Sequence, residues 1–265
     1  MMTRIHPRPT LGLILTTYNR PKLALETLRT AVQIPEFHEL IVVDDASPNR
    51  DARWLDELKN MDSRIQVIPL ARNGGSSHAR NEGIAASTAS HLMFLDDDDR
   101  LLPTGVKRLW SKASRTALAV WVGGVQTEVN KEITGRRWPA CTRVGEVWGL
   151  DQHRLNGKLF SWNVKQSAII PRVLLDQVGG FDPQFHIRNW TDMFYRLSLV
   201  APVRRILGVV YVLNRDGDLD RLTAHKDERV KDQERLLAKH AALFDGNPKR
   251  FKAVDSNFKT MMARK

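Results

Sequence analysis

Cysteine is nearly absent from this chain of 265 residues, which contains only Cys141. A single thiol excludes an internal disulfide and is typical of proteins in a reducing compartment. No apolar run approaches the ~20 residues that a membrane-spanning helix needs. Residues 1–10 are basic and contain proline, without the apolar stretch of a signal peptide behind them. These absences predict a cytoplasmic location, with at most a peripheral position at the inner face of the cell membrane.

The chain also lacks two nucleotide-binding signatures, Gly-x-Gly-x-x-Gly and Gly-x-x-x-x-Gly-Lys-Ser/Thr. Their absence argues against ordinary dinucleotide enzymes and P-loop NTPases. The net charge of +11 favours an anionic partner. Because no nucleic-acid-binding motif accompanies the charge, we expect no nucleic acid. Residues 226–265 carry eleven Lys or Arg against six Asp or Glu, an excess of five. This tail predicts either a solvated helical face or contact with an anionic membrane.

Short apolar runs alternate with helical spacing over the first hundred residues. Such alternation predicts an α/β fold with a mostly parallel, Rossmann-like central sheet flanked by helices. The expected strands cover 11–17, 40–43, 65–70 and 92–95, and helices begin near 21, 53 and 78. Beyond residue 103 we expect strands at 117–122, 167–170 and 206–213, and helices at 104–113, 172–178, 191–199 and 226–244.

The most informative stretch is an acidic run, Asp96–Asp99, directly after the apolar residues 92–95. Two like charges ~4 Å apart repel by about 1 kcal/mol in water and by several times more near a protein surface. Four acids at a strand end are therefore costly without a cation, and their oxygens suit Mg²⁺ or Mn²⁺. Strand alternation would place Asp96 and Asp98 on one face and Asp97 on the other. The alternative is a solvated acidic turn before a helix near Pro103.

Polar residues follow two other predicted strands, at 16–19 and 44–45. Ligands of open parallel sheets bind beyond the carboxyl ends of the strands, so we expect these residues and the acidic run to converge on one crevice. The loop Arg-Asn-Gly-Gly-Ser-Ser (72–77) opens a helix. Loop amides, helix N-termini and arginines all bind phosphate. The combination predicts a site for a metal-bound nucleoside diphosphate.

Four stretches, in order and at compatible spacing, resemble glycosyltransferase family 2 with the GT-A fold. They are Leu-Ile-Leu-Thr-Thr-Tyr-Asn-Arg-Pro (13–21), Leu-Ile-Val-Val-Asp-Asp-Ala-Ser (40–47), Arg-Asn-Gly-Gly-Ser-Ser-His-Ala-Arg-Asn-Glu-Gly-Ile (72–84) and Phe-Leu-Asp-Asp-Asp-Asp (94–99). Val-Gly-Gly-Phe-Asp (178–182) also fits. The resemblance covers about residues 10–215 and is dense in the first hundred. It implies a nucleotide-sugar-binding half at 1–100, an acceptor-binding half of the same domain at 101–225, and a basic, mostly helical tail at 226–265.

The resemblance implies a role for each matching residue. Thr16 and Tyr18 would line the base and ribose, and Asp44 would accept a hydrogen bond from a uracil-like imide. For Asp44 the alternative is a helix cap. Two arginines would approach the diphosphate from the loop around Gly75: Arg80 and, as a second candidate, Arg72. For Arg80 the alternative is a salt bridge on a helix surface.

The resemblance also implies that Asp96–Asp98 is an Asp-x-Asp motif for Mg²⁺ or Mn²⁺. Asp98 is the expected direct metal ligand, and Asp96 is the candidate second ligand. Asp96 or Asp97 would hold the ribose or a metal-bound water. All three residues are expected to contact the donor or its metal.

Inverting members of this family use a carboxylate to deprotonate the acceptor hydroxyl. That base lies in a Glu-Asp-x-Asp-like segment before an Arg-Leu pair. With Arg196 and Leu197 matched, Trp190 fills the base position and Asp192 that of the second acid. Two residues are ~200° apart on a helix, so Asp192 does not simply replace an acid at 190. We nevertheless take Asp192 as the expected base, with Asp182 as another acid in reach. The alternative for Asp192 is a first-turn carboxylate favoured by the helix dipole.

These features predict a metal-dependent, hexosyltransferase-like, inverting glycosyltransferase. It would move a sugar from a nucleotide-diphosphate donor, with a UDP-sugar favoured, to a glycan or lipid-linked acceptor in envelope polysaccharide synthesis. The missing acid at 190 supports an alternative, an inactive GT-A-like protein that binds nucleotide or glycan. A sugar nucleotidyltransferase is disfavoured because no Gly-rich, basic loop follows the first strand. Candidate aromatic faces for an acceptor sugar are Trp138, Trp148, Trp162 and Trp190.

Overall fold

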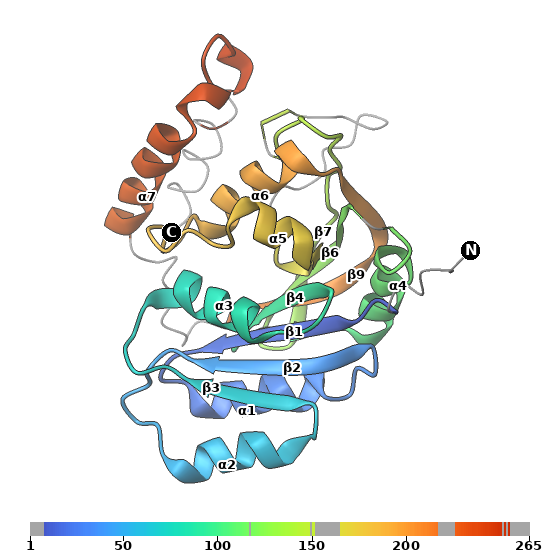
Figure 1. The fold of residues 1–265 in the computed structure, drawn as a ribbon, viewed down its shortest axis with the longest axis vertical. Helices are drawn as coiled ribbons and strands as arrows, with labels where there is room; N and C mark the ends of the chain where they lie inside the picture. Colours follow the sequence, from blue (N-terminus) through green and yellow to red (C-terminus); the bar gives the residue numbers. More distant parts are fainter. Residues whose placement is uncertain are drawn as a thin grey trace, which may run out of the picture.

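The computed structural model describes residues 8–116, 118–148, 150–151, 165–216, 226–250, 252 and 254. The N-terminal part alternates strands and helices as the sequence predicts (Figure 1). Its elements are β1 (Leu11–Thr17), α1 (Pro21–Ala31), β2 (Phe37–Asp44), α2 (Ala52–Met61), β3 (Ile65–Pro69), α3 (Gly75–Ala86) and β4 (His91–Asp96). Pro21 opens α1, where its missing N–H is not needed. Asp51 caps α2 by accepting from the N–H of Trp54.

The second part of the chain adds shorter helices and a mixed set of strands. They are β5 (Arg100–Leu101), α4 (Pro103–Ala113), β6 (Val120–Val129), β7 (Glu132–Arg137), the 3-10 turn η1 (Lys165–Ser167), β8 (Ala168–Pro171), α5 (Arg172–Val178), α6 (Asn189–Val200), β9 (Val203–Asn214), α7 (Lys226–Lys239) and the 3-10 turn η3 (Ala241–Leu243). Neither β5 nor β7 is in our sequence prediction. β7 is a charged, largely exposed strand that forms by pairing with β6, so it lacks the apolar run that would indicate it.

The described strands form one curled sheet in the order β3-β2-β1-β4-β8-β6-β9-β5, with β7 paired to β6. Strands β3, β2, β1 and β4 are all parallel, as are β6 and β9. The remaining pairs are antiparallel. The predicted α/β architecture is confirmed. Between β1 and β4 the direction of the strand order reverses, and such a switch point is where open α/β sheets bind ligands.

Helices cover both faces of the parallel region, which explains why its central strands are apolar on both sides. Helices α1 and α2 lie on one face and α3 on the other (Figure 1). All residues of β1 are buried. Gly83 lets α3 approach β1 closely, because a Cβ at this position would lie 2.5 Å from Cγ2 of Ile14. The core therefore fixes where the carboxyl ends of β1, β2 and β4 lie.

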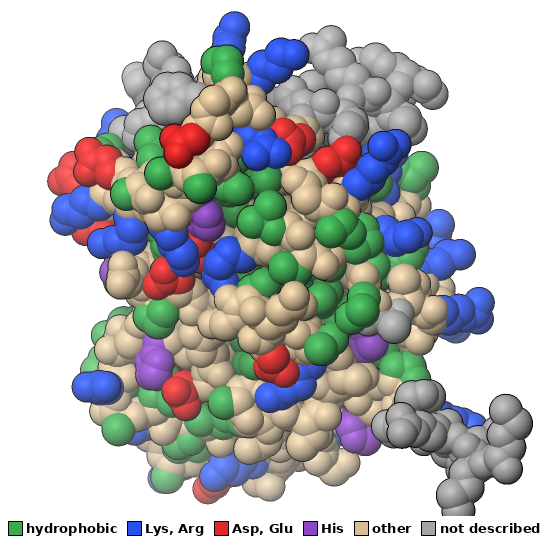
Figure 2. All heavy atoms as spheres, turned by 45° about the horizontal axis from the view of Figure 1, so that its top comes forward, with side chains coloured by type: hydrophobic (Ala, Val, Ile, Leu, Met, Phe, Trp, Pro, Cys, Tyr) green, Lys and Arg blue, Asp and Glu red, His purple; other side chains and the backbone are tan. Residues whose placement is uncertain are grey.

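The described part of the tail is α7 and the turns after it, which lie against α6 (Figure 1). A small separate core joins them through Phe185, Tyr195 and Leu236. Lys and Arg side chains are interspersed with Asp and Glu on this side of the molecule (Figure 2). Helix α7 itself has five basic and four acidic residues. Among the described residues, no helix combines the length and the apolar character that crossing a bilayer requires.

Candidate functional site

The ends of β1, β2 and β4 bring the predicted residues to one edge of the sheet. Thr16 of β1 lies opposite Asp96 of β4, and Thr17 lies opposite Asp44 of β2. The backbone N–H of Asp45 donates to the carbonyl of Thr17 at 2.9 Å. The three polar clusters therefore meet at the switch point, as the sequence predicts.

The loops after β1 and β2 are also joined to each other. The backbone N–H of Asn19 donates to Oγ of Ser47 at 2.7 Å. Asn19 and Ala46 both have left-handed backbones, with φ of 56° and 60°. Such conformations are uncommon outside glycine and often mark functional loops. Tight local turns therefore hold both loops at the switch point.

The acidic run forms a turn rather than an extension of β4. The strand ends at Asp96, and the N–H of Asp99 donates to the carbonyl of Asp96 at 3.2 Å. As a result, Asp97 and Asp98 both face Arg20, at 3.2 and 3.3 Å, while Asp96 pairs with Arg80 from the opposite face of the sheet. The expectation that Asp96 and Asp98 share a face is wrong, because strand alternation stops at Asp96.

Two acids of the run are buried and held by hydroxyl groups. Asp97 accepts a hydrogen bond from Oγ1 of Thr17 at 2.7 Å. Asp99 accepts from the hydroxyl of Tyr211 at 2.8 Å and from the N–H of Asn214 at 2.9 Å. These bonds tie the acidic turn to β1 on one side and to β9 on the other.

The turn carries four carboxylates at 96–99, and Arg20 and Arg80 pair with three of them. Burial raises the pKa of Asp97 to about 7, with Asp98 and Asp96 adding to the rise and Arg20 and Thr17 opposing it. Burial, with the charges of Asp98 and Asp96, also raises the pKa of Asp99 well above its ordinary value. Crowded acids with raised pKa values mark functional sites more often than ordinary surface turns. Binding of a cation by this turn stays a prediction.

Arg80 lies inside the protein and points at the acidic turn. It is 4% exposed, and its Nη2 donates to Asp96 at 2.7 Å. Its guanidinium carbon lies 5.3 Å from the ring centre of Phe181 and 5.5 Å from that of Trp190. Nη1 is buried without a hydrogen-bond partner in the described structure. The contact therefore joins a buried guanidinium to a carboxylate whose side chain is 36% exposed, and it is not a salt bridge on a helix surface.

The Gly-rich loop is held by Asp45, a residue to which the sequence analysis gave no role. Its two carboxylate oxygens accept from the N–H groups of Gly74 and Gly75, both at 2.8 Å. Gly75 has φ of +80°, which disfavours any side chain there. Arg72 is exposed at the start of the loop. Asp45 thus sets the direction of the loop that is predicted to bind diphosphate.

The residues predicted to bind the base differ in exposure. Tyr18 is 46% exposed, whereas Thr16 is buried at the end of β1. Asp44 is fully buried; it accepts hydrogen bonds from Ser47 and pairs with Arg50 at 3.1 Å. These contacts hold the loop after β2; the N-cap of the following helix α2 is Asp51, so the helix-cap alternative for Asp44 is wrong. The contact of Asp44 with a base remains a prediction.

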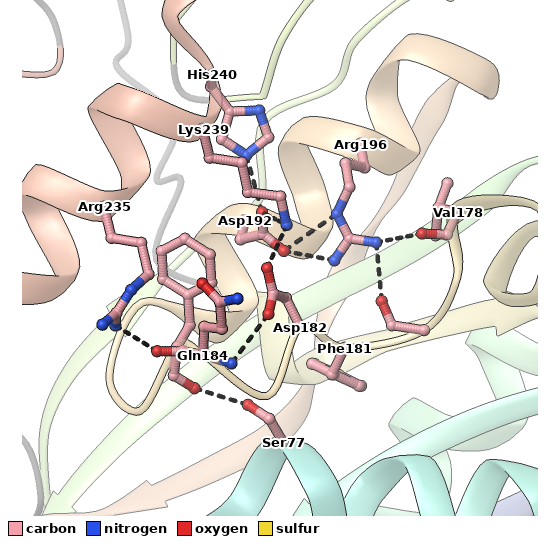
Figure 3. A network of polar contacts seen from close by, with 12 residues as sticks. Ser77, Val178, Phe181, Asp182, Gln184, Asp192, Arg196, Arg235, Lys239 and His240 are labelled. Atoms are coloured by element: carbon pink, nitrogen blue, oxygen red, sulfur yellow. Dashed lines mark hydrogen bonds and ion pairs between the residues drawn. The ribbon is translucent and has the colours of Figure 1, made fainter.

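Asp192, the predicted general base of the transfer, lies in a cluster of cationic side chains (Figure 3). It is fully buried, and Arg196, Lys239 and His240 all contact its carboxylate. Burial alone would raise its pKa, but hydrogen bonds from His240 and Arg196 outweigh this and lower the pKa well below the ordinary value. Such a carboxylate is not free to take a proton from a substrate. The geometry favours the structural alternative for Asp192.

Position 190 supplies no other base. Trp190 is 7% exposed and packs edge-on against Phe94 and Phe181. Trp148 is fully buried, whereas Trp138 is 37% exposed. Trp148 and Trp190 are therefore core residues, and of the described tryptophans named as candidates Trp138 is the exposed one. Trp162 lies outside the described residues.

Sequence reasoning gave no role to Thr17, Arg20 or Asp45. All three lie in the stretches that resemble family 2, at 13–21 and 40–47. Each is the sequence neighbour of Thr16, Pro21 or Asp44, and this position is the feature of the sequence that could have indicated them. Which neighbour points inward depends on where each strand ends.

The comparison with known families agrees with this geometry. The model described as "Glycosyl transferase family 2" matches residues 13–179. The chain belongs to this family. The matched residues include the ends of β1, β2 and β4, the Gly-rich loop and the acidic turn.

Individual relatives share about a quarter to a third of their residues with this family 2 glycosyltransferase over the aligned stretches. The uncharacterized glycosyltransferase YwdF of Bacillus subtilis is 27% identical over 215 residues, which cover 78% of this chain and 76% of YwdF. GalNAc(5)-diNAcBac-PP-undecaprenol beta-1,3-glucosyltransferase of Campylobacter jejuni is 34% identical over 110 residues, 40% of this chain and 35% of the relative. The chain thus matches only about a third of that enzyme's length.

A solved structure shows the fold directly. S. aureus TarS 1–349 in complex with UDP superposes with a TM-score of 0.63 at 16% identity, covering 86% of this chain and 64% of that chain. The same fragment has been solved with UDP-GlcNAc. The predicted GT-A fold is confirmed.

Proposed function

We propose that this family 2 glycosyltransferase moves a sugar from a UDP-sugar to a glycan or lipid-linked acceptor in the synthesis of an envelope polysaccharide. The observation that carries the proposal is the bond from Thr17 to Asp97, which joins the acidic turn to the end of β1 at the switch point. The TarS complexes with UDP and UDP-GlcNAc support a UDP-sugar donor. The undecaprenol-linked acceptor in the name of the C. jejuni relative supports a lipid-linked acceptor. Peripheral contact with an anionic membrane stays a prediction.

A divalent ion, Mg²⁺ or Mn²⁺, would be held by Asp98 with Asp96. The donor chemistry fits, because carboxylate oxygens are ligands that these ions prefer. In this structure Asp98 pairs with Arg20 and Asp96 pairs with Arg80, so one ion held by both acids would take the place of at least one of these arginine contacts. Among the described residues, no group of three or more His, Cys, Asp or Glu side chains is arranged to hold a metal. Mg²⁺ commonly binds through one or two carboxylates and completes its shell with water and substrate phosphates. The bound ion would stabilise the negative charge of the departing nucleoside diphosphate.

The chain's own residues would orient the donor. The Gly-rich loop, fixed by Asp45, presents Arg72 and the first turn of α3 to the diphosphate, with Arg80 behind it. Thr16, Tyr18 and Asp44 would line the base and ribose, and Asp97 would hold the ribose or a water. In the transfer, the acceptor oxygen bonds to the anomeric carbon, the bond from that carbon to the diphosphate oxygen breaks, and the hydroxyl proton leaves to a base. We do not assign that proton to Asp192.

Calorimetric titration tests the donor and metal proposals together. UDP, dTDP and GDP are each added to the protein with Mn²⁺, and then with EDTA in place of the metal. We expect UDP to bind most tightly, and EDTA to weaken its binding at least tenfold. Binding of UDP that is equal with and without metal would remove Asp98 and Asp96 from the metal role. No binding of any of the three nucleotides would remove the donor site.

Trp190 favours a second candidate function, a protein that binds nucleotide sugar without turning it over. Its indole fills the position where the family has a carboxylate and is packed in an aromatic cluster. Incubation with UDP-GlcNAc, UDP-glucose and UDP-galactose, followed by assay for released UDP, separates the two functions. Release of UDP from any donor, with or without added glycan, supports the transferase. Tight UDP binding without release from any donor favours the binding protein.

A further inference from the structure

One face of α7 turns its polar residues inward toward the start of α6. Asp232, Gln233, Leu236 and His240 are buried, at spacings that place them along one side of a helix. Lys239, at the end of the same face, pairs with Asp182 at 2.7 Å and with Asp192 at 2.8 Å (Figure 3). In a solvated tail these polar groups would be exposed, because burying polar atoms without hydrogen-bond partners costs free energy. The contacts they make are therefore specific.

Asp232 makes the most concentrated of these contacts. It is fully buried, and its Oδ2 accepts from three successive backbone N–H groups, those of His186, Ile187 and Arg188, at 3.0, 2.7 and 3.0 Å. Its Oδ1 pairs with Arg235 at 2.9 Å. Three amides directed at one carboxylate fix the path of the chain just before α6. The carbonyls of the same segment are bonded locally, that of His186 to Nδ2 of Asn189 and that of Arg188 to the N–H groups of Thr191 and Asp192, so Asp232 supplies the acceptor for the amides.

The same segment contacts the Gly-rich loop on its other side. Oγ of Ser77 donates to the carbonyl of Phe185 at 2.7 Å (Figure 3). Nδ2 of Asn189 donates to Oγ of Ser76 at 3.1 Å. In Figure 3, Ser77 approaches this segment from the side opposite to Lys239 and His240. Residues 185–189 thus lie between α7 and the first turn of α3.

We propose that Asp232 is a positioning residue for the donor site: by fixing residues 186–188 it holds the first turn of α3 and the Gly-rich loop ready for the diphosphate. The proposal rests on the proposed function, because the loop's ligand is the nucleoside diphosphate. Asp45 holds the loop from the side of β2, and residues 185–189 hold it from the side of α6. Preorganised loops bind more tightly because less freedom is lost on binding. The tail is then part of the donor site's framework.

The test compares Asp232→Ala and Asp232→Asn with a matched control, Glu234→Ala. Glu234 is also an acid of α7, but it is exposed and lies two residues from Asp232, ~200° around the helix. Three properties are measured: thermal stability, UDP affinity with Mn²⁺, and hydrogen exchange of the amides at 74–77 and 186–188. We expect Asp232→Ala to weaken UDP binding about tenfold and to speed exchange in both segments. Asp232→Asn keeps one acceptor oxygen and should weaken binding about threefold, and Glu234→Ala should change nothing beyond twofold.

A double-mutant cycle with Ser77→Ala separates positioning from mere docking of α7. If residues 185–189 carry the effect, Ser77→Ala and Asp232→Asn together weaken UDP binding no more than twofold beyond the stronger single variant. Faster exchange at 186–188 with unchanged exchange at 74–77 and unchanged UDP affinity overturns the proposal and leaves Asp232 a docking residue. If the wild type binds none of UDP, dTDP and GDP, the proposed function fails, and exchange at 74–77 alone decides the positioning role. Where Asp232→Ala does not fold, Asp232→Asn carries the test.

Discussion

Arg80 and Asp96 form an ion pair, 2.7 Å long, that crosses from α3 to the end of β4. The guanidinium also lies against Phe181 and Trp190, so one side chain connects the acidic turn to the start of α6. A cation beside aromatic rings in a desolvated position contributes about 2 kcal/mol or more. The pair is therefore both a structural contact and the inner wall of the proposed donor site.

Arg80→Lys should destabilise the protein while retaining a charge near Asp96. Lysine has a single ammonium group and cannot both pair with Asp96 and cover Phe181 and Trp190. We expect a loss of about 1–2 kcal/mol in the free energy of unfolding, measured in urea. UDP affinity should also fall. An Arg80→Lys protein with unchanged stability and unchanged UDP affinity would mean that the stacked geometry has no role.

Asp98→Ala should abolish metal-dependent UDP binding without destabilising the fold. Asp98 repels Asp97 and Asp99 but also pairs with Arg20, so removing it relieves like-charge repulsion and loses one ion pair, and the two effects offset each other. We expect UDP binding with Mn²⁺ to weaken by about 2 kcal/mol or more, which is about thirtyfold, and the melting temperature to change little. Asp176→Ala, an exposed acid on α5, is the control. Unchanged UDP affinity in the Asp98 variant would count against the metal assignment.

Asp45→Ala should loosen the Gly-rich loop. The change leaves the N–H groups of Gly74 and Gly75 without their acceptor. Hydrogen bonds to a charged group contribute about 1.5–3 kcal/mol each, and water replaces part of this at a partly exposed loop. We expect a loss of about 2 kcal/mol in unfolding free energy and weaker UDP binding in calorimetry. Asp45→Asn, which keeps one acceptor oxygen, should lie between the wild type and Asp45→Ala.

Asp192→Asn should lower the free energy of unfolding, while the rate of UDP release per folded molecule should change little. Removing one partner from a buried ionic cluster typically costs about 3–5 kcal/mol, which chemical denaturation at pH 7 would measure. Any UDP release should be compared per folded molecule. A loss of turnover by orders of magnitude, with stability and UDP binding intact, would restore Asp192 as the base.

The same variant has a pH signature. The folded pKa of Asp192 lies below its ordinary value, so its stabilising contribution is present above that ordinary value and is lost as pH falls. The difference in unfolding free energy between wild type and Asp192→Asn should therefore be full above about pH 5 and shrink below about pH 4. A difference that grows on acidification would contradict the assignment.

Local patterns predicted most of the elements that surround the site. Apolar runs marked β1, β2 and β4, and Pro21 marked the start of α1. The alternation argument failed at Asp96–Asp98 because the period of a strand holds only while the strand continues. The strand β5 had no apolar signal because it is two residues long and forms by pairing with β9, more than a hundred positions away. The strand β7 is the polar, largely exposed return strand of a hairpin with its neighbour β6, so it has no apolar run.

By itself, the sequence determined the layered α/β architecture, the family, and the strand ends at which the site lies, because burial periodicity and short motifs are local properties. Only the tertiary structure decided which partners surround each acid. Asp192 and Asp98 are both carboxylates in plausible positions, yet one is enclosed by Arg196, Lys239 and His240 while the other lies in a turn crowded with acids. The partners that decide this for Asp192 include residues 47 and 48 positions away, and those that hold Asp232 lie 44 to 46 positions away. Such long-range pairings set the charge state of a carboxylate, and no local pattern encodes them.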